Sequence, residues 1–149
     1  MAQEEALRPR WAKDLVTFRG HAMVRSAHPT TIEVTTEEYL TENGDCIVGV
    51  GASKGCQGLD ESVKEGLRRA GSRVTIRLSA GGETFVVNAR GDPRLELSHP
   101  HDMVIRKSDF VSERTLAVGA DRSARDIPRE MVRLLKDPKT TGTLEIEVE

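Results

Sequence analysis

Several residue types that define common protein classes are scarce in this chain of 149 residues. Aromatic residues make up only 3% of it, which predicts a core built mainly of Val, Ile and Leu. Its two cysteines, Cys46 and Cys56, are too few for the disulfide framework of a small secreted domain. We expect them to be reduced thiols of an intracellular protein.

Long apolar segments are also missing. No stretch approaches the ~18 apolar residues that a membrane-spanning helix needs. The first eleven residues carry acidic side chains where a signal peptide would have an apolar segment. We therefore expect a cytoplasmic protein without a membrane partner.

The net charge is small, at −2, although 31% of the residues are charged. A near-neutral chain has no overall field to draw it to nucleic acid, so nonspecific binding driven by total charge is disfavoured. Binding at a local basic patch remains open.

Short blocks of sequence recur at a spacing of about seventy residues. Arg19-Gly20 is followed by His28-Pro29 at the same spacing as Arg90-Gly91 is followed by His99-Pro100. Two further pairs of blocks recur in the same order: residues 50–54 with 118–122, and residues 74–78 with 144–148. The recurrence predicts an internally duplicated chain. Because no cysteine recurs, it argues against a thiol function shared by the two halves.

Hydrophobic patterns predict the same order of elements in each half: three strands, a helix and a final strand, βββαβ. Strands are expected at residues 14–20, 30–36, 45–52, 74–78, 83–89, 103–106, 115–120 and 144–149. A first helix has Leu59, Val63 and Leu67 on one face, and a second begins near Asp126 and Pro128 and ends before Pro138.

These elements predict a single α+β domain over residues 1–149. We expect a tail at 1–13, a first repeat at 14–80 and a second repeat at 83–149, joined by a Gly81-Gly82 hairpin. The two repeats are expected to form a pseudo-two-fold, mostly antiparallel, barrel-like core with two helices, because closure removes exposed strand edges. Two separate sheet layers with the helices on one face are the alternative.

Two strand-to-helix loops, residues 51–55 and 119–123, are the first candidate site. Both are rich in small residues and carry a cation at the same position, Lys54 or Arg122. Small residues let backbone N–H groups approach a phosphate or carboxylate, and a following helix adds a positive dipole end. The alternative is close strand–helix packing with a solvated cation.

The loops between the Arg-Gly and His-Pro pairs are the second candidate. His28 and His99 are candidate acid–base residues because histidine titrates near neutral pH, and Arg19 and Arg90 are candidate anion ligands. Histidines can also bind a metal, but the sequence has no compact set of three or four ligands here, so no metal site is predicted. Alternatively, the imidazoles bind backbone groups at turns.

A short basic stretch containing Arg106 and Lys107, beside Phe110 and close to Arg114, is the third candidate. Cations next to an aromatic ring can hold RNA through phosphate contacts and stacking. The corresponding residues 35–39 of the first half are acidic, so the halves differ here. A charged, solvated strand end is the alternative.

Five motifs follow one another along the chain: Phe18-Arg19-Gly20-His21, residues 44–50 (GDCIVGV), Ser98-His99-Pro100, residues 102–110 (DMVIRKSDF) and residues 114–118 (RTLAV). Together they resemble a conserved archaeal family of unknown function, domain of unknown function 371. One departure is Arg122-Ser123-Ala124, where the family has a lysine and two alanines. The resemblance implies an archaeal, cytoplasmic protein, and it supplies no activity, cofactor or catalytic residue.

The residues therefore favour a non-enzymatic module that binds an anionic ligand, either a phosphate-bearing small molecule or RNA. The predicted ligands are Arg19, Lys54, Arg90, Arg106, Lys107 and Arg122. Two alternatives remain open: a small enzyme with a His/Arg acid–base site between the halves, and a structural or assembly subunit. The sequence indicates no cofactor and no oligomeric state.

Overall fold

Four long strands with alternating polarity form the first sheet, sheet A. The computed structural model describes residues 12–40 and 44–149. The strands of sheet A are β1 (Ala12–Arg19), β4 (Arg73–Ala80), β5 (Glu83–Arg90) and β8 (Thr141–Val148), and buried and exposed residues alternate along most of each strand. They lie in the antiparallel order β1-β8-β4-β5.

The predicted hairpin between β4 and β5 is confirmed. Ala80 pairs with Glu83, and the two residues between them, Gly81 and Gly82, have φ angles of 56° and 83°. Positive φ at both central positions is the backbone of a two-residue hairpin turn, which glycine adopts most readily.

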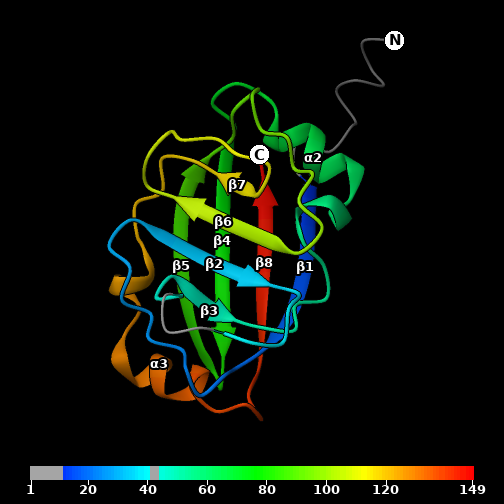
Figure 1. The fold of residues 1–149 in the computed structure, drawn as a ribbon. Helices are drawn as coiled ribbons and strands as arrows, with labels where there is room; N and C mark the ends of the chain where they lie inside the picture. The colour runs from blue at the N-terminus through cyan, green and yellow to red at the C-terminus, as the bar shows by residue number, and fades with distance from the viewer. Residues whose placement is uncertain (1–11, 41–43) are drawn as a thin grey trace.

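Four shorter strands form sheet B, which crosses in front of sheet A in Figure 1. Its strands are β2 (Thr31–Thr35), β3 (Ile47–Gly49), β6 (Asp102–Arg106) and β7 (Thr115–Ala117), in the order β3-β2-β6-β7. The central β2–β6 pair is antiparallel, whereas β2–β3 and β6–β7 are parallel. Apolar side chains from both sheets fill the space between them.

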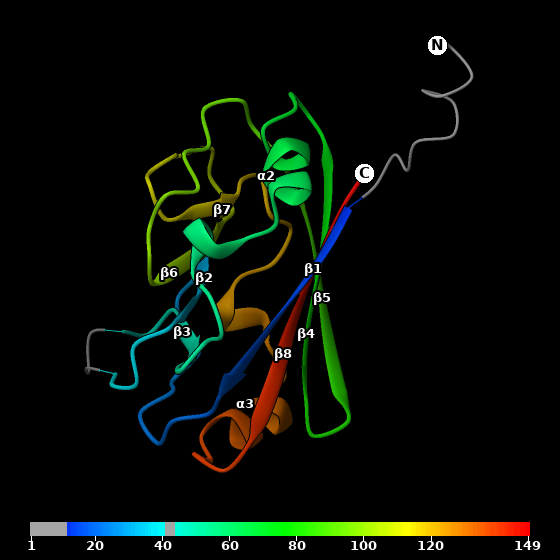
Figure 2. The same ribbon diagram turned by 90° about the vertical axis from the view of Figure 1, so that its right-hand side faces the viewer.

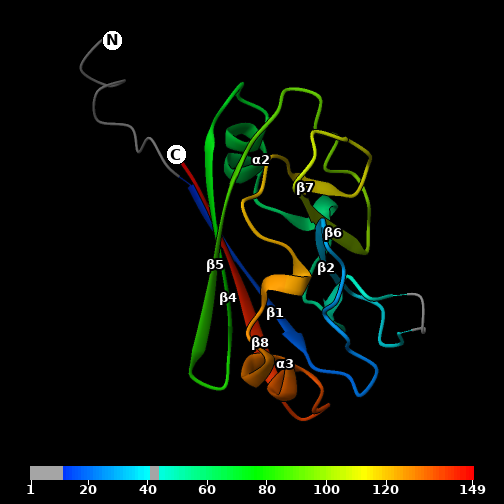
Figure 3. The ribbon, with the colours of Figure 1, turned by 90° about the vertical axis from the view of Figure 1, so that its left-hand side faces the viewer.

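Both helices are shorter than the sequence predicts, and each is preceded by a 3-10 turn. Helix α2 (Glu61–Leu67) follows η1 (Cys56–Gly58), and α3 (Arg129–Leu135) follows η2 (Ala124–Asp126). Asp126 belongs to η2, where its side chain forms a capping box with Ser123, and Pro128 is the N-cap of α3. Figures 2 and 3 show α2 and α3 at opposite ends of the two sheets.

The predicted barrel-like core is wrong, since the described strands form two separate sheets. Where the edges of the two sheets meet, an isolated β-bridge takes the place of a continuous ladder. Arg19 pairs with Val50 at one such edge, and Arg90 pairs with Val118 at the other. The reason is that β3 and β7 have three residues each, too few to extend a ladder to the edges of sheet A. The outer face of sheet A carries no helix (Figures 2 and 3).

The predicted tail at residues 1–13 lies mostly outside the described part of the chain, and its last two residues, Ala12 and Lys13, belong to β1. Within the described part, no helix has the length and apolarity to cross a membrane.

Candidate functional site

The backbone N–H groups of the two predicted anion loops form hydrogen bonds inside the protein. In the loop 51–55, the first three N–H groups donate to the carbonyl oxygens of Glu37, Thr35 and Thr17 at 2.8–2.9 Å. The first three N–H groups of the loop 119–123 are used in the same way, at 2.9–3.0 Å. In each loop these three N–H groups are thus engaged within the protein and are not available to an anion.

The cations of these loops each contact a strand at the edge of sheet A. Lys54 Nζ donates a 2.8 Å hydrogen bond to Asp14 of β1, and the guanidinium of Arg122 lies 5.3 Å from the ring centre of Phe85 on β5. Since β1 and β5 are opposite edges of sheet A, Lys54 and Arg122 do not converge on one ligand.

The two His-Pro histidines receive backbone hydrogen bonds. Nδ1 of His28 accepts from the N–H groups of Thr30 and Thr31 at 3.2 and 3.1 Å, and Nδ1 of His99 accepts from those of His101 and Asp102 at 3.1 and 2.9 Å. An accepting Nδ1 carries no proton, so both rings place their proton on Nε2. Each imidazole caps the turn that leads into its strand, β2 or β6.

His28 and His99 lie at opposite ends of the β2–β6 pair. Thr31, which follows the His28 turn, pairs with Arg106, while Thr35 pairs with Asp102, which follows the His99 turn. Five strand residues, each rising about 3.4 Å, separate the two turns. A single acid–base site shared by the two histidines is therefore not formed.

The arginines of the two Arg-Gly pairs lie over glycines. A Cβ at Gly51 would come within 3.0 Å of the Arg19 guanidinium, and one at Gly119 within 2.7 Å of the Arg90 guanidinium. Arg19 also pairs with Glu38. Arg90 forms no ion pair with a described residue.

The third predicted site is largely engaged in internal contacts. Arg106 Nε donates to Thr115 Oγ1 at 2.8 Å, and the guanidinium stacks 4.9 Å from the ring centre of Phe110. Lys107 Nζ lies 3.7 Å from Asp126, and Arg114 donates to Asp102 at 3.0 Å. Phe110 itself is exposed, so one face of the predicted stack is open to solvent.

The structure gathers charged groups on sheet B that the sequence did not single out. Glu33, on β2, is 6% exposed, and the one hydrogen bond that its side chain forms with a described residue comes from the thiol of Cys46 at 3.7 Å. We call Glu33, Cys46, Asp102, Arg106 and Arg114 the Glu33 cluster. Burial and the nearby Asp102 carboxylate raise the pKa of Glu33, and burial also lowers the pKa of Arg106.

A cavity of about 150 Å³ opens over this cluster, and we call it the Glu33 cavity. Its polar lining includes Glu33, Glu37 and Asp102, and its apolar wall includes Leu40 and Ile47. Thr35 and Tyr39 complete the lining. Perturbed ionisable groups beside a cavity are a recurrent mark of functional sites.

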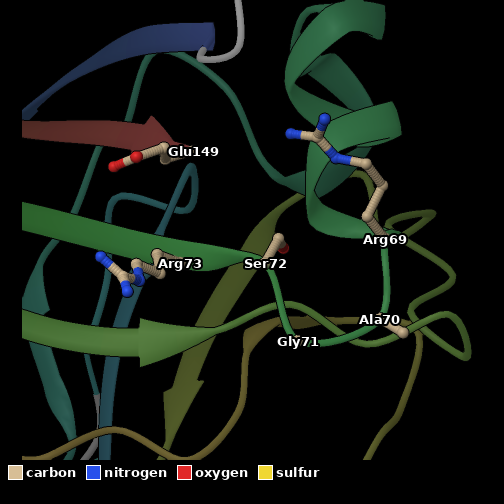
Figure 4. A pocket seen from close by; sticks show the side chains of 6 residues that line it. All are labelled: Arg69, Ala70, Gly71, Ser72, Arg73 and Glu149. Atoms are coloured by element: carbon tan, nitrogen blue, oxygen red, sulfur yellow. The ribbon is translucent and has the colours of Figure 1, made fainter.

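A second cavity, of about 520 Å³, lies where α2 turns into β4, and we call it the turn cavity. Residues 69–73 and Glu149 line it. Figure 4 shows Arg69 projecting from the end of the helix, with Arg73 and Glu149 side by side at the ends of β4 and β8. Neither Arg69 nor Arg73 forms a side-chain hydrogen bond or ion pair with a described residue.

Ser72, in the lining of the turn cavity, has an unsatisfied hydroxyl. The residue is 7% exposed, and its Oγ is the one buried side-chain N or O atom without a hydrogen-bond partner in the described chain. A buried hydroxyl without a partner costs about 1–3 kcal/mol in stability, so the Ser72 hydroxyl marks a position where a partner is missing.

A third cavity, of about 280 Å³, adjoins the turn cavity. The two share Arg73 and Glu149 in their linings, and Thr75 and Asn88 also line the third cavity.

Comparison with known proteins is consistent with the motifs noted in the sequence. The family model described as "Domain of unknown function (DUF371)" matches residues 16–149. The chain belongs to the DUF371 family. It is 41% identical, over 125 residues, to the uncharacterized protein MJ0206 of Methanocaldococcus jannaschii, an alignment that covers 84% of this chain and 92% of that protein.

The described part of this DUF371 chain contains no group of three or more His, Cys, Asp or Glu side chains that could hold a metal ion. Its large exposed apolar side chains, Leu15, Met23, Tyr39 and Phe110, come from four different segments.

The Glu33 cavity and the turn cavity could not be predicted from the sequence, for different reasons. Glu33 had a visible signal, because it is the only charged residue of a β-branched strand, but strand alternation does not reveal whether loops cover the outer face. Arg69 follows the end of α2, where the helix dipole favours a cation, so its charge alone does not indicate a binding site. Nothing in the sequence indicates that Ser72 lies beside it without a partner.

Proposed function

We propose that this DUF371 protein is a non-enzymatic module that binds a small phosphate-bearing molecule, a nucleotide, in the turn cavity. The observation that carries the proposal is the presence of two arginines, Arg69 and Arg73, whose side chains have no partner among residues 12–40 and 44–149, beside the unsatisfied hydroxyl of Ser72. Guanidinium groups bind phosphate oxygens through charge-assisted, often bidentate hydrogen bonds.

The size and the remaining lining support a nucleotide over a simple anion. A volume of about 520 Å³ falls in the range of small-molecule sites. Glu149 repels phosphate, but its carboxylate suits the hydroxyl groups of a ribose. The cavity lined by Thr75 and Asn88 offers hydrogen-bonding groups for the rest of the ligand.

Of the six cations predicted as ligands, Arg90 is the one that pairs with a residue of the turn cavity. It pairs directly with Arg73 across β4 and β5, and like charges at opposed strand positions destabilise a sheet unless an anion screens them. Anion binding by Arg19, Lys54, Arg106, Lys107 and Arg122 remains a separate prediction.

The experiment is an isothermal titration of the protein with AMP at low and moderate salt, using adenosine as the neutral comparison. We expect AMP to bind more weakly as salt increases, and adenosine to bind at least tenfold more weakly than AMP. The Arg69→Ala/Arg73→Ala variant should lose at least tenfold in affinity for AMP, because each charge-assisted hydrogen bond contributes about 1.5–3 kcal/mol.

The control is Lys136→Ala/Lys139→Ala, which removes two exposed cations near the end of α3, in the turn that leads to β8. It should bind AMP like the unmodified protein. Equal AMP binding by the arginine double variant, or no AMP binding at millimolar concentration, would refute the proposal. If single-stranded RNA alone binds and the arginine variant abolishes this binding, the ligand is a polymer and the nucleotide assignment is wrong.

We also propose that residues 14–80 and 83–149 are duplicated halves of one domain. Support comes from hydrogen bonds that recur at the predicted spacing. Ser53 Oγ accepts from the N–H of Thr17, and Asp121 Oδ1 accepts from the N–H of Asn88. The sheets have the same symmetry. If β1, β2, β3 and β4 are taken to correspond to β5, β6, β7 and β8, exchanging corresponding strands only reverses the orders β1-β8-β4-β5 and β3-β2-β6-β7.

A further inference from the structure

The Glu33 cavity carries an inference that does not depend on the proposed nucleotide site. It lies on sheet B, and no residue that lines it also lines the turn cavity. We propose that the Glu33 cavity binds a small organic cation, a primary ammonium group on a short aliphatic chain.

The first support is the state of Glu33 itself. Its side chain is nine-tenths buried and lines the cavity, yet the hydrogen bond that its carboxyl receives within the described residues is a long one, from the thiol of Cys46. A thiol is a weak donor. Buried carboxylates are usually paired with strong donors, so the Glu33 carboxyl lacks the donor that an ammonium group would supply.

The second support is the balance of charge around the cavity. Three carboxylates line it, those of Glu33, Glu37 and Asp102. Asp102 is paired with Arg114 at 3.0 Å. Among the described residues, the ion pair of Glu37 is with His101, 3.7 Å away and charged only when protonated. Arg114 and Arg106 also lower the pKa of Glu33 and so offset part of the negative charge. Three carboxylates against two guanidinium groups still leave the region negative, and a bound cation neutralises this charge.

The third support is the apolar part of the lining. Leu40 and Ile47 form a wall suited to an aliphatic chain, and Tyr39, which is 67% exposed, presents an aromatic ring at the rim. A ring face attracts an ammonium group by a cation–π interaction. A cavity of about 150 Å³ admits a short alkyl chain and excludes large ligands.

A metal ion fits less well. The part of the chain that the structure describes offers no set of three or more suitable ligands, and two of the three carboxylates already have a charged or chargeable neighbour. An ammonium group needs only hydrogen-bond acceptors around its three N–H donors. The apolar wall would also serve no purpose for a bare ion.

The test is a titration with n-butylammonium, followed by amide chemical shifts, with 1-butanol as the neutral analogue of similar size. We expect butylammonium to shift the amides of residues 33–40 and 99–102, and 1-butanol to leave them unchanged. Glu33→Gln keeps the side-chain shape without the charge and should weaken butylammonium binding at least tenfold. Tyr39→Ala, at an exposed position, should weaken it about two- to fivefold.

Glu130→Gln, which removes an exposed carboxyl from α3, is the matched control and should bind as the unmodified protein does. If Glu33→Gln fails to fold, the Tyr39→Ala result decides. Three results would overturn the proposal. The first is that Glu33→Gln, or Tyr39→Ala in its place, binds butylammonium as tightly as the unmodified protein does. The others are that 1-butanol binds as well as butylammonium, or that 20 mM butylammonium shifts no amide resonance. None of these results bears on AMP binding, so the two proposals succeed or fail separately.

Discussion

Lys54 and Asp14 form an ion pair that holds the loop after β3 against strand β1. The Asp14 side chain is 6% exposed. Its carboxylate lies 2.8 Å from the Lys54 ammonium and accepts a hydrogen bond from the backbone N–H of Asp60 at 2.9 Å. One buried carboxylate thus joins β1, the loop and the start of α2.

Removal of the cation should destabilise the fold. Lys54→Ala leaves the buried Asp14 carboxylate without its counter-ion, and we expect a loss of about 1–3 kcal/mol in the free energy of unfolding, measured with urea. Arg122→Ala is the control, since it removes only a cation–π contact to Phe85 worth about 0.5–1 kcal/mol. If the Lys54 variant is as stable as the unmodified protein, the ion pair is not structural.

The histidine turns give a second prediction. Because His99 Nδ1 accepts two backbone N–H groups, His99→Ala should lower the free energy of unfolding by about 1 kcal/mol, as loss of a cap does. His99→Asn should retain most of the stability, since an asparagine oxygen can accept the same N–H groups. Thermal unfolding of the two variants distinguishes them.

The same pair of substitutions at His28 should behave alike, because its Nδ1 accepts from Thr30 and Thr31. Equal loss of stability in the alanine and asparagine variants would contradict a capping role at either histidine.

Much of the fold follows from local patterns in the sequence. The alternation in β4 and β8 and the Gly81-Gly82 turn are local signals, and the structure has these elements where the sequence predicts them. The division into two sheets is not local. It depends on β3 and β7 ending after three residues, which reflects pairing with strands distant in sequence.

The candidate sites were harder to predict for a related reason. Lys54 and Arg122 each lie in the loop after a short strand of sheet B, but the partners of these cations lie on opposite edges of sheet A. Likewise, sequence alone does not reveal that Glu33 is buried, because its neighbours Asp102 and Arg114 come from distant segments.

The two cysteines should be unreactive in the folded protein. Burial and the nearby Glu33 raise the pKa of Cys46 to about 11, and burial raises that of Cys56 to about 12. At pH 8 the thiolate, which is the reactive form, is then about one part in a thousand or less.

Treatment with iodoacetamide at pH 8 should leave both thiols unmodified in the native protein and alkylate both in urea, as mass spectrometry can measure. Rapid alkylation of Cys46 in the native protein would show that its surroundings do not suppress the thiolate.

The last prediction concerns Glu33 and pH. Burial, together with Asp102, raises its pKa in the folded state above the ordinary value, despite Arg114 and Arg106, which lower it. The folded protein therefore holds this proton more tightly than the unfolded chain does. The stability that this proton contributes is fully present at pH values below the pKa of Glu33 in the unfolded chain. It is lost as the pH rises through the pKa of Glu33 in the folded protein.

Glu33→Gln removes this titration. The variant should match the unmodified protein most closely near pH 4 and become the more stable of the two as pH rises to 8, measured as free energies of unfolding at each pH. Groups with lowered pKa values, such as Asp92 and Asp126, lose stabilisation in acid, but they are present in both proteins and cancel in the difference. A stability difference that stays constant or shrinks between pH 4 and pH 8 would mean that Glu33 is charged at no cost in the folded protein.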